Sequence, residues 1–128
     1  MSSETLTIEI KVDAEKLLNL FISAFEGGCN YWAMLDDTNI DTSHCSGQYP
    51  SERWFDAIWN KGMSMPVLDA EEPEDKLGDL TKAGMINGLK LMAEQHESHY
   101  SDFAEGNDDA ITADVWFQLA LMNEIVYG

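Results

Sequence analysis

Carboxylates are the most numerous groups in this chain that could take part in chemistry. Twenty-four Asp and Glu stand against seven Lys and Arg, a formal net charge of −17. The densest run is residues 69–75 (DAEEPED), and Asp108, Asp109 and Asp114 form a second group. Such groups can bind a cation, transfer protons or attract a basic surface. The second group lacks the spacing of a twelve-residue EF-hand loop, which favours caps at a helix start over a metal site.

The residue pattern gives little support to a transition-metal site, to nucleophilic catalysis or to a nucleotide-binding loop. His44 beside Cys45, and His96 with His99, are the only combinations that could bind a transition metal, and no CxxC or HExxH pattern accompanies them. The chain also lacks GxSxG, the phosphate-binding P-loop and GxGxxG. We therefore predict no metal site, no cofactor and no catalytic residue. The two cysteines are expected to be free thiols.

The segment EGGCNYW at residues 26–32 admits two interpretations. In the first, Asn30, Tyr31 and Trp32 form a wall that stacks on a flat, nucleotide-like ligand and hydrogen-bonds to its polar edge, with Arg53 as a weak phosphate anchor. In the second, the segment is a tight helix-to-strand connection whose aromatic side chains fill the core. The pattern favours the second, because alternate residues of a strand point inward.

Periodicity places these residues on a succession of elements. Residues 5–11 alternate as a strand, Asp13 caps a helix to about residue 26 that Gly27 and Gly28 end, and residues 31–35 alternate again. A turn-rich loop follows to residue 50. Residues 51–59 suit either a helix capped by Ser51 or a strand.

The second half continues the alternation of strands and helices. Residues 63–67 read as a strand that Pro66 confines to a sheet edge, and residues 69–75 as a charged loop. Thr81 caps a helix to about residue 96, in which Gly84 and Gly88 allow another element to approach closely. A last helix spans residues 112–122, Asn123 stops it in the left-handed conformation, and residues 124–127 form a short strand. The expected fold is one α+β domain over residues 1–128, with a mixed or antiparallel sheet and about three helices.

Two segments resemble a family of small proteins from bacteriophages, prophages and related mobile elements. They are EGGCNYW at residues 26–32 and NDDAITADVWFQLALMNEIVYG at residues 107–128. Members typically carry EGGxNYW after the first helix and end in an ADxxxQ helix followed by GExVYG. Cys29 departs from the Ser or Ile of that pattern, and Met122-Asn123 replaces Phe-Gly. The resemblance implies an accessory mobile-element protein and implies no activity.

The net charge determines the leading functional hypothesis. It exceeds the magnitude of about 2 to 8 that solubility needs, and it opposes direct binding to nucleic acid or an anionic membrane. We expect a non-enzymatic protein that binds and inhibits a host factor with a basic surface, such as a nucleic-acid-binding or defence protein, by imitating DNA charge. The expected contact residues are carboxylates from the two acidic groups: Asp69, Glu71, Glu72, Glu74, Asp75, Asp108 and Asp109.

Two alternatives stay open at this point. One is sequestration of a nucleotide-like signal at residues 30–32, and the other is a homo-oligomeric structural or morphogenesis protein that pairs through a strand edge at residues 63–69. No signal peptide and no apolar stretch of about 20 residues is present, so we expect a location in the host cytoplasm.

Overall fold

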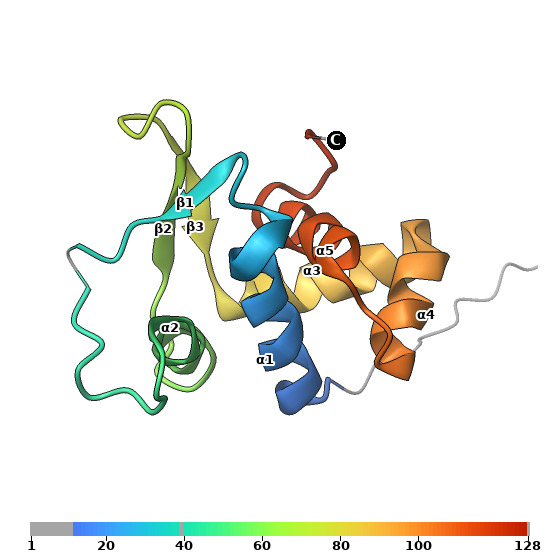
Figure 1. Cartoon of the computed structure of the whole chain (residues 1–128), viewed down its shortest axis with the longest axis horizontal. Helices are drawn as coiled ribbons and strands as arrows, with labels where there is room; N and C mark the ends of the chain where they lie inside the picture. Colours follow the sequence, from blue (N-terminus) through green and yellow to red (C-terminus); the bar gives the residue numbers. More distant parts are fainter. Residues whose placement is uncertain (1–11, 39, 128) are drawn as a thin grey trace, which may run out of the picture.

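The computed structural model describes residues 12–38 and 40–127. The strand expected at residues 5–11 lies outside the described residues. Figure 1 shows a small sheet and one helix at one end of the molecule, and four helices grouped at the other. The elements, in chain order, are α1 Ala14–Ser23, the π-helical turn η1 Ala24–Gly28, β1 Ala33–Leu35, α2 Pro50–Trp59, β2 Met65–Asp69, β3 Lys76–Leu80, α3 Lys82–Gln95, α4 Glu97–Glu105 and α5 Ala110–Met122. The α+β class is confirmed, with five α-helices in the described part where the sequence predicted about three.

The first helix begins where its sequence indicates and continues as a π-helical turn. The Asp13 carboxylate accepts hydrogen bonds from the backbone N–H groups of Glu15 and Lys16, which satisfies two amides that have no partner within the helix. The chain then widens into η1 and leaves the helical conformation at Gly27, where φ is 169°. The predicted N-cap is confirmed. The predicted glycine stop is correct in place but not in conformation: α1 ends at Ser23 and η1 at Gly28, and neither Gly27 nor Gly28 takes the left-handed conformation.

The sheet is antiparallel, and its strand order is β1-β2-β3. The edge position predicted for the Pro66 strand is therefore wrong, because β2 lies between two partners. Pro66 has no N–H to give, but its carbonyl accepts a hydrogen bond from the Asp36 N–H just beyond the end of β1. β2 therefore offers no free edge through which two copies of the chain could pair at residues 63–69.

Two elements of the middle region differ from or refine the sequence prediction. Residues 51–59 form a helix, which starts at Pro50 with Tyr49 as its N-cap instead of Ser51. In the helical conformation, Phe55 and Ile58 lie on one face and are buried. The sequence did not predict β3, whose segment KLGDL contains a glycine and two charges. Gly78 is explained by packing, since a side chain there would meet Leu121.

Helices α3 and α5 pack closely through the two glycines that the sequence singled out. A Cβ at Gly84 would lie 2.7 Å from the Ala120 carbonyl oxygen, and one at Gly88 would lie 2.8 Å from the Ala120 nitrogen. The predicted close approach is confirmed. The Thr81 cap is also confirmed, through its hydroxyl and the Gly84 N–H. Helix α4 was not predicted.

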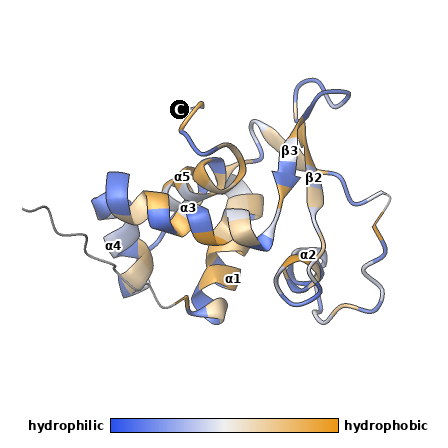
Figure 2. Cartoon of the chain, turned by 180° about the vertical axis from the view of Figure 1, so that it is seen from behind, coloured by the Kyte–Doolittle hydropathy of each residue, from blue (hydrophilic) through white to orange (hydrophobic). Residues whose placement is uncertain are grey.

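Helix α5 is the centre of the core. Seven of its residues are buried, and Figure 2 shows hydrophobic segments in α5 and in its neighbours α1 and α3. A helix that is apolar on every side must be enclosed by other elements. It begins at Ala110, two residues before the predicted start, with Asp109 as its N-cap. It stops at Asn123 with φ 64°, as predicted. The strand predicted at residues 124–127 is wrong: these residues form no ladder with the sheet.

None of the described helices is both long and apolar enough to cross a bilayer.

Candidate functional site

Asp114 joins the two segments that carry the family resemblance. Its Oδ2 accepts a hydrogen bond of 2.7 Å from the Tyr31 hydroxyl, and its Oδ1 accepts one of 2.7 Å from the Trp32 indole. The same Oδ1 accepts from the Gln118 amide, one helical turn later, at 3.2 Å. These donors lie up to 83 positions away in the sequence. Asp114 is thus the point at which the EGGCNYW segment is fastened to α5.

Gln118 extends this network to the end of the described chain. Its Oε1 accepts hydrogen bonds of 2.8 Å from the backbone N–H groups of Val126 and Tyr127, and its Nε2 donates to the Tyr127 carbonyl at 2.9 Å. A buried side-chain amide therefore satisfies the backbone of this segment, as a neighbouring strand would. Sequence reasoning gave neither Asp114 nor Gln118 a binding role; the i, i+4 spacing within ADxxxQ was the available signal.

The residues predicted to form a ligand wall, residues 30–32, do not lie together: part of the segment is in the core and part is on the surface. Trp32 is 2% exposed and packs between Phe117, at 5.5 Å between ring centroids, and Tyr127, at 4.8 Å and nearly parallel. Its ring faces protein and is closed to a stacking ligand. Asn30 donates to the Phe25 carbonyl, and Tyr31 remains exposed. The core interpretation holds for Trp32.

Arg53 does not join that wall. One nitrogen of its guanidinium donates to the carbonyls of Gly47 and Gln48, at 3.3 and 3.1 Å. It therefore orders the loop ahead of α2, and it does not line the cavity beside Tyr31.

A cavity of about 460 Å³ opens beside Asp114, and we call it the motif cavity. The residues that matter for its chemistry are Tyr31, Ile111, Asp114, Gln118, Ile125 and Tyr127. Partial desolvation, the hydrogen bond to Asp114 and the negative charge of that residue raise the pKa of Tyr31 to about 12. The phenol therefore stays protonated at neutral pH and is poorly suited to act as a base there.

The carboxylates of residues 69–75 stand at the turn between β2 and β3. Asp69 is used locally, since its Oδ1 accepts from the backbone N–H groups of Glu71 and Glu72 and shapes the turn. The other four acids are exposed and accept no hydrogen bond from another side chain in the described part of the chain. We call them the acidic hairpin: Glu71, Glu72, Glu74 and Asp75.

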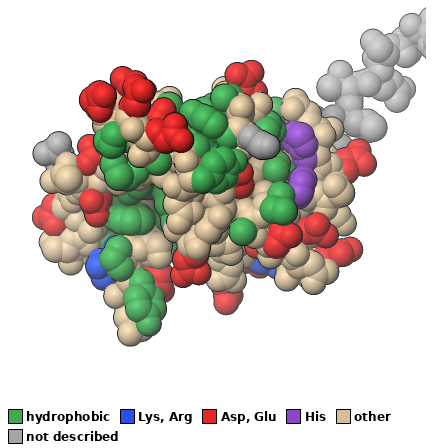
Figure 3. Space-filling model, turned by 45° about the horizontal axis from the view of Figure 1, so that its top comes forward, with side chains coloured by type: hydrophobic (Ala, Val, Ile, Leu, Met, Phe, Trp, Pro, Cys, Tyr) green, Lys and Arg blue, Asp and Glu red, His purple; other side chains and the backbone are tan. Residues whose placement is uncertain are grey.

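The base of the acidic hairpin lies against the end of the EGGCNYW segment, whose Gly27, Gly28 and Tyr31 line the motif cavity. The Ala70 N–H, at its base, donates to the Trp32 carbonyl at 2.9 Å, and Asp69 pairs with Ala33 in the sheet. Figure 3 shows the carboxylates over the hairpin at one end of a face whose middle is covered by apolar side chains. Residues far apart in the sequence thus place negative charge beside an apolar surface.

Asp108 and Asp109 do not join the acidic hairpin. They precede α5 on the α4–α5 connection, toward the opposite end of the long axis in Figure 1. Asp109 serves as a helix cap: its Oδ1 accepts from the Thr112 N–H at 2.9 Å, and that hydrogen bond lowers the pKa of its carboxyl. Of the seven predicted contact residues, the structure groups four and gives Asp69 and Asp109 local backbone roles.

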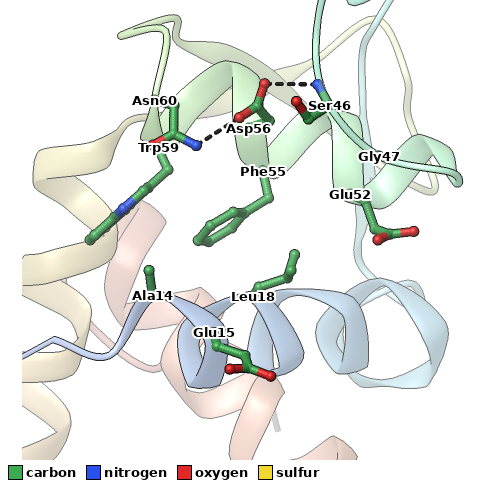
Figure 4. A pocket seen from close by; sticks show the side chains of 10 residues that line it. All are labelled: Ala14, Glu15, Leu18, Ser46, Gly47, Glu52, Phe55, Asp56, Trp59 and Asn60. Carbon is green, nitrogen blue, oxygen red and sulfur yellow. Dashed lines mark hydrogen bonds between the residues drawn. The ribbon is translucent and has the colours of Figure 1, made fainter.

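A second cavity, of about 450 Å³, lies between α1, α2 and the loop at residues 46–47. Figure 4 shows Phe55 and Leu18 pointing toward each other across it. Its charged lining is acidic throughout: Glu15, Glu52 and Asp56. Hydrogen bonds from Asn60 and from the Ser46 N–H lower the pKa of Asp56, so it is ionised at neutral pH. An anionic ligand would therefore meet negative charge in this cavity as well as in the motif cavity.

The basic side chains leave the acidic surface largely unneutralised. Among residues 12–38 and 40–127 the ion pair is Lys76 with Asp79. Lys16 donates to the Ala104 carbonyl, and Lys82 lies 4.6 Å over the Trp59 ring. These cations stabilise backbone and aromatic groups and do not pair with carboxylates. Within the described ranges, no three His, Cys, Asp or Glu residues gather in a way that could hold a metal ion.

The two thiols should differ sharply in reactivity. Burial and the charge of Asp114 raise the pKa of Cys29 to about 12. Partial desolvation and the charge of Asp56 raise the pKa of Cys45 as well, but Cys45 is only half-buried and so remains within reach of a reagent. The thiolate is the reactive form, so an aromatic disulfide reagent at about pH 8 should label Cys45 and spare Cys29 until the chain unfolds. Cys45→Ser should abolish labelling of the folded protein, and Cys29→Ser should preserve it. Native labelling of Cys29, detected by peptide mass spectrometry, would contradict this assignment.

Comparison with known proteins adds no assignment. No family model, no curated protein and no solved structure matches the chain.

Proposed function

We propose that this protein is an acidic accessory protein of a phage or mobile element. It binds the basic surface of a host protein and inhibits that protein. The observation that carries the proposal is the acidic hairpin. Its four exposed carboxylates have no basic partner in the described part of the chain, while Lys16, Arg53 and Lys82 are engaged elsewhere. Unneutralised charge at the end of a hairpin is available to steer and bind a positively charged partner.

The proposal includes the class of partner and the place of action. A nucleic-acid-binding or defence protein of the host cytoplasm has the basic groove that such carboxylates would occupy in place of phosphate. The nucleotide-binding alternative has less support, because the charged lining of both cavities is acidic.

Capture from a bacterial lysate tests the proposal. The immobilised chain should retain a basic protein at about 50 mM salt and release it by about 500 mM, because screening weakens contacts between exposed charges. Changing Glu71 and Glu72 to lysine should reduce the retained amount about tenfold. The matched control changes Glu94 and Glu105, two exposed acids on α3 and α4, to lysine and should retain the partner.

Two results would contradict the proposal. One is capture that is indifferent to salt. The other is equal loss in the hairpin variant and in the control, which would mean that the acidic surface acts only through its total charge. Addition of duplex DNA checks the mimicry directly, since DNA should compete with the chain for the retained protein.

A further inference from the structure

Exposed hydrophobic side chains gather around the motif cavity. Four of the seven large hydrophobic side chains that are exposed in the described part of the chain belong to it or adjoin it. We call them the apolar patch: Ile111 (67% exposed), Tyr31 (54%), Val126 (52%) and Ile125 (39%). They come from the EGGCNYW segment, the first turn of α5 and the final segment. Single exposed hydrophobics are ordinary, whereas a contiguous group marks an interaction site.

The Asp114 and Gln118 side chains of the cavity wall are already paired. Both oxygens of Asp114 accept hydrogen bonds, and the Gln118 amide is fully engaged with Asp114 and the final segment. The wall therefore makes little demand on an occupant for hydrogen bonds. A cavity of about 460 Å³ with apolar edges has room for one large aliphatic or aromatic side chain together with the backbone that carries it.

Charge decides between the candidate occupants. A second copy of this chain would bring the same acidic hairpin and the same net charge of −17 to the interface. Like charges facing each other cost free energy, so the hairpin beside the patch opposes self-association. An anionic segment is opposed for the same reason. A segment that carries an apolar residue among basic ones matches both parts of this face (Figure 3).

We propose that the motif cavity binds one large apolar side chain of the partner, flanked by lysine or arginine residues that contact the acidic hairpin. This inference builds on the proposed function and adds the recognition element that charge alone lacks. The apolar anchor supplies specificity and buried area, and the flanking cations supply steering. Ile111, at the start of α5, is the most exposed residue of the patch and should contribute to the anchor contact.

Two synthetic peptides test the anchor. Acetyl-Lys-Lys-Leu-Lys-Lys-amide and its serine-centred analogue are titrated into the full chain labelled with nitrogen-15. The reporters are the Trp32 indole N–H and the backbone amides of Val126 and Tyr127, which line or adjoin the cavity. We expect the leucine peptide to bind about fivefold or more tightly than the serine peptide, in proportion to the apolar area it buries.

Matched variants separate the anchor from the charges. Ile111→Ser should remove the preference for leucine. Ile86→Ser removes another exposed isoleucine, on α3 and outside the cavity, and should preserve it. The Glu71 and Glu72 reversal should weaken both peptides alike. If the reversal variant kept its preference for leucine and bound both peptides with unchanged affinity, the proposed function would be overturned and the anchor would stand.

Three results would overturn the anchor itself. They are equal affinity for the two peptides, absence of saturable shifts at the reporters, and loss of the leucine preference in Ile86→Ser as well as Ile111→Ser. Sedimentation of the chain alone adds a fourth: a dimer that Ile111→Ser dissolves would make a second copy the occupant.

Discussion

Replacing Asp114 with alanine should lower the free energy of unfolding by about 2 to 3 kcal/mol. The substitution leaves the Trp32 indole N–H, buried against Phe117 and Tyr127, without its acceptor. A buried donor without a partner costs about 1 to 3 kcal/mol, and the lost acceptor is charged. The Tyr31 hydroxyl is exposed and can turn to water, so Trp32 accounts for most of the loss. Urea denaturation, followed by tryptophan fluorescence, measures the change.

Asparagine at position 114 is the informative comparison. Its carbonyl oxygen can still accept from Trp32, so Asp114→Asn should lose about 1 kcal/mol or less. Asp108→Ala removes a neighbouring carboxylate that has no hydrogen-bond partner among the described residues and should change stability by about 0.5 kcal/mol at most. Equal losses in all three variants would contradict the special position of Asp114.

Titration of Tyr31 provides an independent readout of the same contact. Its folded-state pKa of about 12 lies above the ordinary value of 10.0. The contribution of this group to stability is therefore fully present below pH 10.0 and is lost as pH rises toward 12. In Asp114→Asn the charge is gone but the partial desolvation, which is the largest cause of the shift, stays, so the pKa of Tyr31 should fall only part of the way toward its ordinary value. Carbon-13 NMR of the labelled tyrosine ring carbon follows this directly.

Replacing Gly28 with alanine should destabilise the fold by about 1 to 3 kcal/mol. A Cβ at this position would lie 2.7 Å from the Ala110 carbonyl oxygen and 3.3 Å from the Asp114 nitrogen. Both contacts are with the backbone of α5, which cannot rotate aside as a flexible side chain can. The EGGCNYW segment must then shift away from α5, which also strains the hydrogen bonds to Asp114.

The adjacent glycine is the matched control. A Cβ at Gly27 meets nothing within 4 Å, and its φ of 169° is extended backbone that any residue can adopt. Gly27→Ala should therefore stay within about 0.5 kcal/mol of the parent chain. Thermal and urea denaturation of the two variants compare neighbouring positions of one motif. Similar losses would indicate that the glycines serve the turn itself and not the approach to α5.

Several elements follow from residues that are close together in the chain. Asp13, Thr81 and Asn123 begin or end helices as predicted, because a cap depends on hydrogen bonds within about four residues. The buried role of Trp32 and the close approach at Gly84 and Gly88 were also predictable. Trp32 precedes β1, so its burial follows from its large apolar surface and not from strand alternation. The smallness of glycine is likewise a property of the residue itself.

The incorrect predictions concern long-range partners. Pro66 has no N–H, which is typical of an edge strand. β2 is nevertheless central, because the hydrogen bond between Pro66 and Asp36 uses the Pro66 carbonyl as acceptor and requires no N–H from Pro66. Residues 124–127 have the composition of a strand, but the Gln118 amide satisfies their backbone, so they need no strand partner. Neither outcome is encoded within a window of a few residues.

The sequence by itself determined the acidic character of the protein, its α+β class, the ends of most helices and the absence of recognisable catalytic motifs. Composition and local hydrogen bonding are sufficient for these properties. Only the tertiary structure decided that Asp114 is the centre of the site and that four hairpin carboxylates stand beside an apolar patch while Asp108 and Asp109 lie elsewhere. The reason is distance along the chain: Asp114 contacts Tyr31 and Trp32 from more than 80 positions away, the Ala70 N–H contacts the Trp32 carbonyl across the sheet, and folding alone brings these residues together.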